Sequence, residues 1–104
     1  MIVEFEKHYL QELFEKGKVD DKKHRLPQNV IKKYCLRVFT LQNAPNPEAL
    51  YPMKSLNFER LSGDKSGIYS IRIDLKYRLE FKLRSGDDAA VTICSLQEIS
   101  NHYD

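Results

Sequence analysis

The sequence contains no tryptophan, only two cysteines and four glycines, and no long run of apolar residues. Because a helix that crosses a bilayer needs roughly 18 consecutive apolar residues, the sequence predicts no membrane span and no membrane partner. The N-terminus, MIVEFEKHYL, carries charges at Glu4, Glu6 and Lys7, which interrupt the apolar segment that a secretory signal peptide requires. We therefore expect a cytoplasmic protein.

The two cysteines, Cys35 and Cys94, match neither a CxxC motif nor the spacing of metal ligands. We expect two buried thiols, no metal site and no small-molecule cofactor. Lysine and arginine together number 17 against 15 aspartates and glutamates, which gives a net charge of +2. This charge is too small to indicate a nucleic-acid partner by itself, so the distribution of the basic residues matters more than their sum.

The length of 104 residues predicts one domain, 1–104, with a single hydrophobic core. In EKHYLQELFEKG (6–17), apolar residues recur at helical spacing, and Gly17 is well placed to end the helix. A second helix should begin near Pro27, which suits a first turn, and should end at NAPNPEAL (43–50). Its apolar stripe consists of Val30, Ile31, Tyr34, Cys35, Val38 and Leu41.

The second half of the chain changes to the two-residue period of half-buried strands. GIYSIRIDL (67–75) and KYRLEFKLR (76–84) alternate apolar and polar residues, and AAVTICSL (89–96) follows as a further strand before a polar tail, QEISNHYD (97–104). IVEF (2–5) is a possible short N-terminal strand. The expected class is α+β, with two N-terminal helices packed on one face of a small antiparallel β-sheet.

The apolar alternation also decides the register of the hairpin in SIRIDLKYRLEF. A loop of residues 74–76 keeps apolar residues opposite each other and places Arg72 directly opposite Arg78, whereas a two-residue turn would pair Arg72 with Leu79. Two guanidinium groups on a rigid sheet can hold a phosphate. Alternatively, nearby carboxylates such as Glu80 compensate the two charges, and the residues alone leave both interpretations open.

Further candidate site residues surround this hairpin. MKSLNFERLSGDKSG, just upstream, supplies Lys54, Arg60 and Lys65 near the same edge, although a loop lysine is more often simply solvated. At the C-terminus, His102 supplies an imidazole that titrates near neutrality and Tyr103 supplies a phenol. Both groups can transfer protons, so this end of the chain is a candidate source of acid–base chemistry.

Three consecutive segments, SGDKSG (62–67), YSIRI (69–73) and YRLEF (77–81), resemble the RelE/ParE superfamily of bacterial type II toxins, and most closely its HigB-like branch. The order of elements is also similar, and the resemblance covers nearly the whole chain. It implies a ribosome-dependent, metal-independent endoribonuclease that cleaves mRNA. It also implies a helix-turn-helix antitoxin that binds the toxin and blocks it.

The resemblance assigns roles to individual residues. Cleavage by attack of the 2′-hydroxyl on the adjacent phosphate needs a base, an acid and positive charge. Arg78 matches the strand arginine of the family, Lys65 matches a basic loop residue, and Arg72 lies where a second charge can be offered. His102 and Tyr103 match the terminal acid or base.

Two departures from the family pattern affect these roles. HigB-like toxins often carry His-Pro before the basic loop, where this chain has Glu59-Arg60, so Glu59 becomes a candidate base. They often end Asp-Tyr-His, where this chain ends Asn-His-Tyr-Asp, so the roles of His102 and Tyr103 could be exchanged. The candidate phosphate-binding residues are Arg72, Lys65, Arg60 and Lys54.

Two other functions fit the same scaffold. A ParE-like toxin binds and poisons DNA gyrase without cleaving RNA, and a degenerate member only binds its antitoxin. The adjacent His102 and Tyr103 favour the nuclease over the ParE-like toxin, because that toxin needs no acid–base pair at this end. The sequence lacks the exposed aromatic platforms of a stand-alone single-strand binder, so we expect the ribosome to position the mRNA.

Overall fold

The computed structural model describes residues 1–101 of the chain, and its first helix follows the sequence pattern closely. Helix α1 spans His8–Lys16. Gly17 follows it in the left-handed conformation, with φ of 72°, and its N–H donates to the carbonyl of Leu13 at 3.0 Å. Only glycine adopts this conformation without a steric penalty, so the predicted helix terminator is confirmed with its physical reason.

Helix α2 spans Gln28–Asn43 and begins directly after Pro27, as predicted. The Tyr34 hydroxyl donates to the Leu10 carbonyl at 2.7 Å, which joins the two helices inside the core. Of the predicted apolar stripe, Cys35 is half-buried at the margin of the core. The other cysteine, Cys94, is fully buried. The buried members of the stripe are Val30, Ile31, Tyr34, Val38 and Leu41.

Five strands form one sheet in the order β1-β5-β4-β3-β2. The strands are β1 Ile2–Phe5, β2 Glu59–Arg60, β3 Tyr69–Arg72, β4 Tyr77–Ser85 and β5 Thr92–Asn101. The α+β class is confirmed, including the N-terminal strand. The sheet is mixed, because β1 pairs parallel with β5 while the other neighbours are antiparallel. Parallel neighbours require a long connection, and here both helices and three strands separate the pair.

Short 3₁₀ helices occupy the connections. The first, η1 (Lys22–His24), lies between α1 and α2; η2 (Pro47–Leu50) and η3 (Lys54–Leu56) lie between α2 and β2; η4 (Gly63–Lys65) lies between β2 and β3.

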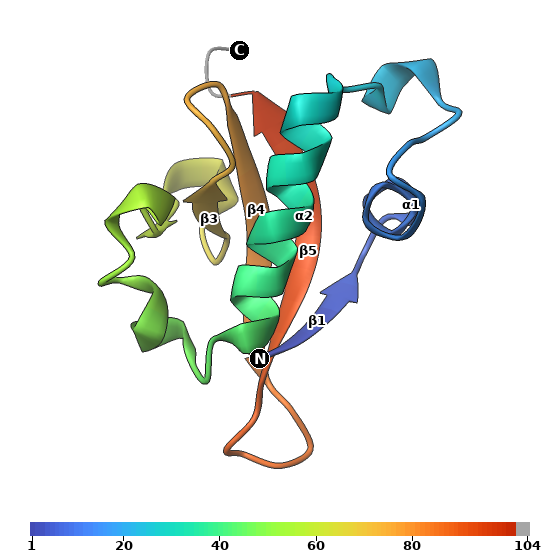
Figure 1. Ribbon diagram of the computed structural model, residues 1–104. Coiled ribbons are helices and arrows are strands. Elements are labelled where there is room, and N and C mark those ends of the chain that lie inside the picture. Colours follow the sequence, from blue (N-terminus) through green and yellow to red (C-terminus); the bar gives the residue numbers. More distant parts are fainter. Residues whose placement is uncertain (102–104) are drawn as a thin grey trace.

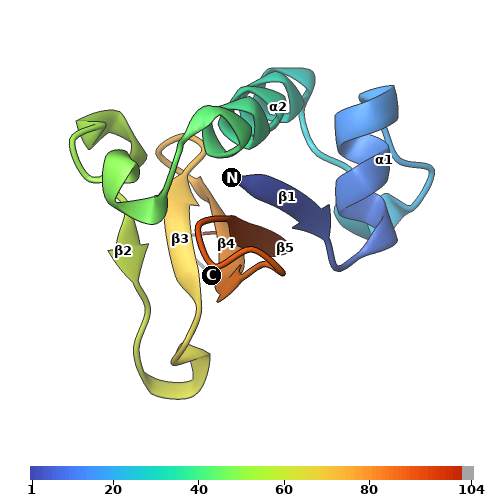
Figure 2. The ribbon, with the colours of Figure 1, turned by 90° about the horizontal axis from the view of Figure 1, so that it is seen from below.

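Figure 1 shows α2 crossing one face of the sheet, with α1 beside β1. Figure 2 shows the loop that contains η4 extending on the side of the sheet away from α2.

Strand β5 is longer than the sequence pattern indicated. Residues 97–101, expected as part of a polar tail, belong to this strand, and residues 98–101 are paired with β4. Leu96 pairs with Phe81 and Ile99 pairs with Leu79, so β5 has one extra residue between these pairs, a β-bulge. The bulge allows Leu96 and Ile99 to face the core together although their spacing breaks the two-residue period. That interruption is why the expectation of a tail at 97–101 was wrong.

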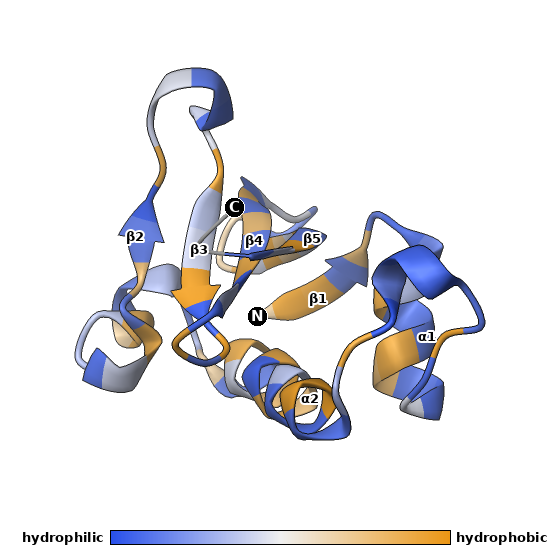
Figure 3. Cartoon of the chain, turned by 90° about the horizontal axis from the view of Figure 1, so that it is seen from above, coloured by the Kyte–Doolittle hydropathy of each residue, from blue (hydrophilic) through white to orange (hydrophobic). Residues whose placement is uncertain are grey.

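The core lies between α1, α2 and one face of the sheet. Apolar and polar positions alternate along the strands and along α2 (Figure 3), so each element contributes one face to this layer. Tyr34 and Phe81 are the largest fully buried side chains. None of the helices in the described part of the chain is long and apolar enough to cross a membrane.

Candidate functional site

The hairpin between β3 and β4 has the register that the sequence predicted. Arg72 lies opposite Arg78, and the Ile73 N–H donates to the Tyr77 carbonyl at 2.9 Å across the loop. The Asp74 carboxylate stabilises the turn, because it accepts hydrogen bonds from the backbone N–H groups that follow it. The two arginines are therefore neighbours on the face of the sheet opposite the helices.

Arg78 is a buried charged residue on this face, held by several hydrogen bonds. It is only 6% exposed. Its Nε donates to the Ser70 hydroxyl at 2.9 Å, and its Nη2 donates to the Asn57 carbonyl at 2.8 Å. Within residues 1–101, the third nitrogen of the guanidinium, Nη1, has no hydrogen-bond partner. Every fully buried side-chain nitrogen or oxygen in those residues does have a partner, so Nη1 must be in contact with solvent. One amino group of a fixed guanidinium is thus available to a ligand.

The charge of Arg78 is buried, and neighbouring carboxylates compensate it only in part. Burial lowers the pKa of the Arg78 guanidinium, and the neighbouring Arg72 lowers it further, while Glu59 and Glu80 act in the opposite direction. A guanidinium stays protonated despite such shifts, so the positive charge remains. An anion on this face would meet a desolvated charge, which attracts it more strongly than a solvated one does.

Glu59 lies at the sheet edge beside this arginine. It pairs with Ser70 in the register of β2 and β3, and its Oε1 is 3.5 Å from Nη2 of Arg78. Its side chain is 47% exposed, so it can contact a bound molecule while remaining next to the guanidinium. The structure therefore brings together two of the predicted catalytic residues, a carboxylate and a cation.

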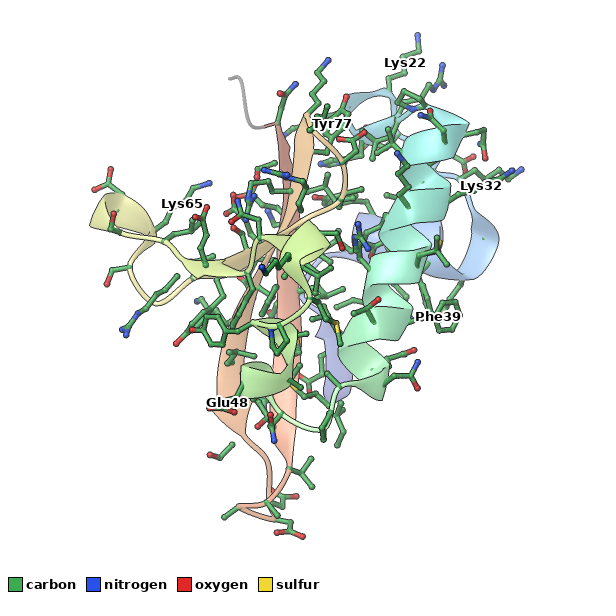
Figure 4. The ribbon with its side chains drawn as sticks, turned by 60° about the vertical axis from the view of Figure 1, so that its left-hand side comes forward. Lys22, Lys32, Phe39, Glu48, Lys65 and Tyr77 are labelled. Carbon is green, nitrogen blue, oxygen red and sulfur yellow. The ribbon has the colours of Figure 1, made fainter. Side chains whose placement is uncertain are left out.

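Lys65 reaches from the η4 loop to the sheet (Figure 4). Its Nζ donates to both carboxylate oxygens of Glu80, at 3.0 and 2.8 Å, and lies 3.9 Å from Glu98 on the neighbouring strand. The hydrogen bond to Glu80 raises the pKa of Lys65, so the ammonium is retained at neutral pH. Lys65 is therefore at the candidate site, but it is paired with carboxylates rather than left available.

The remaining predicted phosphate-binding residues are placed differently. The side chain of Arg72 has no carboxylate partner within residues 1–101, although its carbonyl accepts a hydrogen bond from Arg37 Nε at 2.8 Å. Arg60 pairs with Tyr69 in the register, and its guanidinium lies 6.0 Å from that ring. Because Tyr69 packs against the core on the other face of the sheet, Arg60 is not grouped with Arg78. Lys54 is exposed on η3, and its side chain has no hydrogen bond or ion pair with the site residues in the described part of the chain.

His102 and Tyr103, the predicted proton-transfer residues, lie outside the described residues. Their predicted roles therefore stay predictions. Within residues 1–101, no group of three or more His, Cys, Asp or Glu side chains is arranged to hold a metal ion.

Three residues that fix the site were missed in the sequence as functional residues. Ser70 and Asn57 hold Arg78, and Glu80 holds Lys65. Asn57 has φ of 43°, a left-handed conformation that asparagine tolerates better than most residues, and a lone asparagine before an apolar residue could have signalled such a turn. The role of Glu80 could have been predicted from one feature of the sequence. It is a charged residue in the middle of a strand, and a charged residue that is buried there requires a partner.

Comparisons with known families and with known protein sequences indicate the same kind of protein. The family described as the RelE-like toxin of type II toxin–antitoxin system HigB matches residues 3–95. Toxin HigB-1 of Vibrio cholerae serotype O1 is 33% identical over 87 residues, which cover 83% of this chain and 87% of that protein.

Two solved structures share the fold. The YoeB/ParE toxin from Agrobacterium tumefaciens has a TM-score of 0.62 at 14% identity, and covers 99% of this chain and 100% of its own. YafQ from Escherichia coli has a TM-score of 0.55 at 14% identity, and covers 97% of this chain and 92% of its own. At this identity the likeness concerns the fold alone.

Proposed function

Because this chain belongs to the RelE-like toxins of type II toxin–antitoxin systems, in the HigB-like family, we propose that it is a ribosome-dependent, metal-independent endoribonuclease that cleaves mRNA in the cytoplasm. Membership of the family implies an antitoxin partner, for which we propose a helix-turn-helix protein. The observation that carries the proposal is the buried Arg78, held by Ser70 and Asn57 with one amino group at the surface. Such a group suits a phosphate on an RNA strand better than a solvated lysine does.

In the proposed reaction, the scissile phosphate binds to Arg78 and Arg72. Glu59 removes the proton from the ribose 2′-hydroxyl, and the resulting oxygen attacks the adjacent phosphorus. The bond from phosphorus to the 5′-oxygen breaks, and His102 or Tyr103 donates a proton to that oxygen. The products are a 2′,3′-cyclic phosphate and a 5′-hydroxyl, so no water is consumed in this step.

The electrostatics of the described residues support this division of roles. Glu59 Oε1 lies 3.5 Å from Arg78 Nη2, so a phosphate on the arginine would bring its ribose within reach of the carboxylate. Negative charge grows on the phosphate oxygens in the transition state, and a fixed guanidinium stabilises that charge without reorganising. Lys65 offers a further positive charge if it exchanges Glu80 for the phosphate.

Replacement of Arg78 tests the proposal. Arg78→Ala should remove roughly 2–4 kcal/mol of transition-state stabilisation, hence at least about a hundredfold in the rate of cleavage of ribosome-bound mRNA. Induced without antitoxin, the wild-type protein should arrest growth and the variant should not. Arg78→Lys, which keeps the charge but loses the fork of donors, should recover only a small part of the rate.

Arg84→Ala is the matched control, because Arg84 lies on the same strand but is exposed and paired with Glu4. It should retain the wild-type rate. An Arg78→Ala protein that is folded by circular dichroism and still cleaves mRNA would refute the proposal. Intact mRNA together with accumulated gyrase–DNA breaks would favour the ParE-like function instead.

A further inference from the structure

A cleft adjoins the candidate site at the end of the molecule where β5 ends and β4 begins. Its volume is about 470 Å³, within the usual range for ligand pockets. One wall is the connection between α1 and α2. Figure 4 shows Lys22 of this connection and Tyr77 of β4 at the same end of the molecule. The residues that line the cleft include Tyr9, Lys23, His24, Arg25, Lys65 and Glu98.

The cleft lies next to the strand position of Arg78, because Ser100, which lines the cleft, pairs with Arg78 between β5 and β4. Lys65 and Glu98 line it, and Lys65 also binds Glu80, the residue two positions after Arg78 on β4. A strand of RNA with its scissile phosphate on Arg78 therefore meets this cleft at one side of the site. The inference that follows rests on the proposed function.

His24 provides the cleft with a fixed aromatic surface. Its ring stacks on Tyr9 with centroids 3.7 Å apart and planes 7° apart, and its Nδ1 lies 2.6 Å from Oδ2 of Asp21. Tyr9 in turn accepts a hydrogen bond from the Ile99 N–H at 2.9 Å. The His24 side chain keeps 27% of its surface exposed. The imidazole is thus held in place before any ligand arrives, which lowers the cost of stacking a base on it.

The charges beside this ring favour an RNA backbone. Lys23 and Arg25 are exposed on the connection, and both line the cleft together with Lys65. Glu98 is the acidic residue of the lining, and it already lies 3.9 Å from Lys65. An acidic peptide would use these cations but would leave the ring unused, whereas a nucleotide uses both. We propose that this cleft binds the nucleotide next to the scissile phosphate, its base on His24 and its phosphate near Lys23 and Arg25.

The test measures binding without cleavage. The probe is a ribosome carrying mRNA that is 2′-O-methylated across the decoding-site codon, which removes the attacking hydroxyl. Lys23→Ala with Arg25→Ala should weaken binding of the toxin roughly tenfold and should reduce its dependence on salt. The matched control is Lys18→Ala with Lys22→Ala, which removes the same charge from the same connection at exposed positions that do not line the cleft. The control pair should bind like the wild type.

A double-mutant cycle, in which the protein loses the His24 side chain and the mRNA loses one base, identifies the ligand. His24→Ala should weaken binding several-fold on intact mRNA, and this loss should disappear on one mRNA that lacks a single base of the codon. Equal losses for the Lys23/Arg25 pair and the Lys18/Lys22 pair would overturn the proposal, since the cleft would then contribute only general charge. A His24→Ala loss that is the same on every mRNA would overturn it as well, because the contact would then be to ribosomal RNA or to the fold. Cleavage of unmodified mRNA by the wild type tests the proposed nuclease separately from this binding.

Discussion

At the scale of single residues, Arg78 illustrates how a small sheet can present a charge in a defined direction. A surface arginine loses side-chain entropy when it binds, but the partners of Arg78 already restrict its guanidinium in the free protein. Ser70 lies on the neighbouring strand and Asn57 in the turn before β2, so two elements share this task. The candidate site is therefore preorganised by residues that need not touch the proposed RNA substrate.

Ser70→Ala should misplace Arg78 without removing its charge. Loss of the hydroxyl leaves Nε of Arg78 without its partner, which should cost about 1 kcal/mol of folding stability. The cleavage rate at saturating ribosomes should fall about tenfold, because one fixed hydrogen bond to the guanidinium is lost. Unfolding in urea and single-turnover cleavage measure the two effects. Ser66→Ala, at an exposed position in the preceding loop, is the control, and an unchanged rate for Ser70→Ala would contradict the positioning role.

At the scale of elements, two features decide how the segments meet. Helix α1 ends at a left-handed glycine, and the η4 loop is attached to the sheet through Lys65 and Glu80. The first feature is local and could be predicted from Gly17 in the sequence. The second joins residues from different elements, and no local pattern indicated that this lysine would meet a buried carboxylate.

Gly17→Ala should destabilise the protein by about 1 kcal/mol. The residue has φ of 72°, and an added Cβ meets no atom within 4 Å, so the cost comes from backbone strain rather than from a clash. Chemical denaturation measures it. Gly86→Ala serves as the control because Gly86 does not have a positive φ, and it should change stability by less than about 0.5 kcal/mol. Equal effects at the two glycines would argue against the strain explanation.

The Lys65–Glu80 pair should show a measurable coupling free energy. In a double-mutant cycle with Lys65→Met and Glu80→Gln, we expect about 1 kcal/mol of coupling, reduced from the value for a fully buried pair because the lysine side chain is 49% exposed. Lys82→Met, an exposed lysine on β4, should be additive with Glu80→Gln. Additivity of Lys65→Met with Glu80→Gln would show that the loop is held by other contacts.

At the scale of the whole molecule, the folded state excludes water from groups that ionise only at high pH. Burial raises the pKa of Cys94 from 9.0 to about 12, and burial also raises the pKa of Tyr34. In the unfolded chain these groups lose their protons earlier than in the folded protein. The stability that each group contributes is therefore fully present below the pKa that the group has in the unfolded chain. It is lost as the pH rises toward the pKa that the group has in the folded protein.

For Cys94 the loss should occur between pH 9 and about pH 12. The change should be of the order of 4 kcal/mol at most, since each pKa unit corresponds to about 1.4 kcal/mol. Urea denaturation at a series of alkaline pH values measures it. Cys94→Val should flatten this dependence, whereas Cys35→Ala, at a half-buried thiol, should leave most of it in place. A slope that is the same in Cys94→Val as in the wild type would exclude the thiol as its cause.

The sequence by itself determined the two helices, the hairpin and its register. Each of these follows from the spacing of apolar residues within one short segment, and a slip by one residue would turn Arg72 or Arg78 toward the core. The sequence also showed the family resemblance, because the segments from the basic loop to the second strand of the hairpin follow one another directly. The candidate residues Lys65, Arg72 and Arg78 lie in these segments, and Glu59 was found from the departure from the family pattern just before them.

Only the tertiary structure decided which charges are paired and which are left available. Contacts of Arg78 with Asn57 and Ser70, and of Lys65 with Glu80, join residues that are distant in sequence, so periodicity carries no information about them. The same holds for Arg60, which an edge strand of two residues directs to the opposite face. Burial then acts on the groups that packing has brought together, so the strength of each charge is a property of the folded chain.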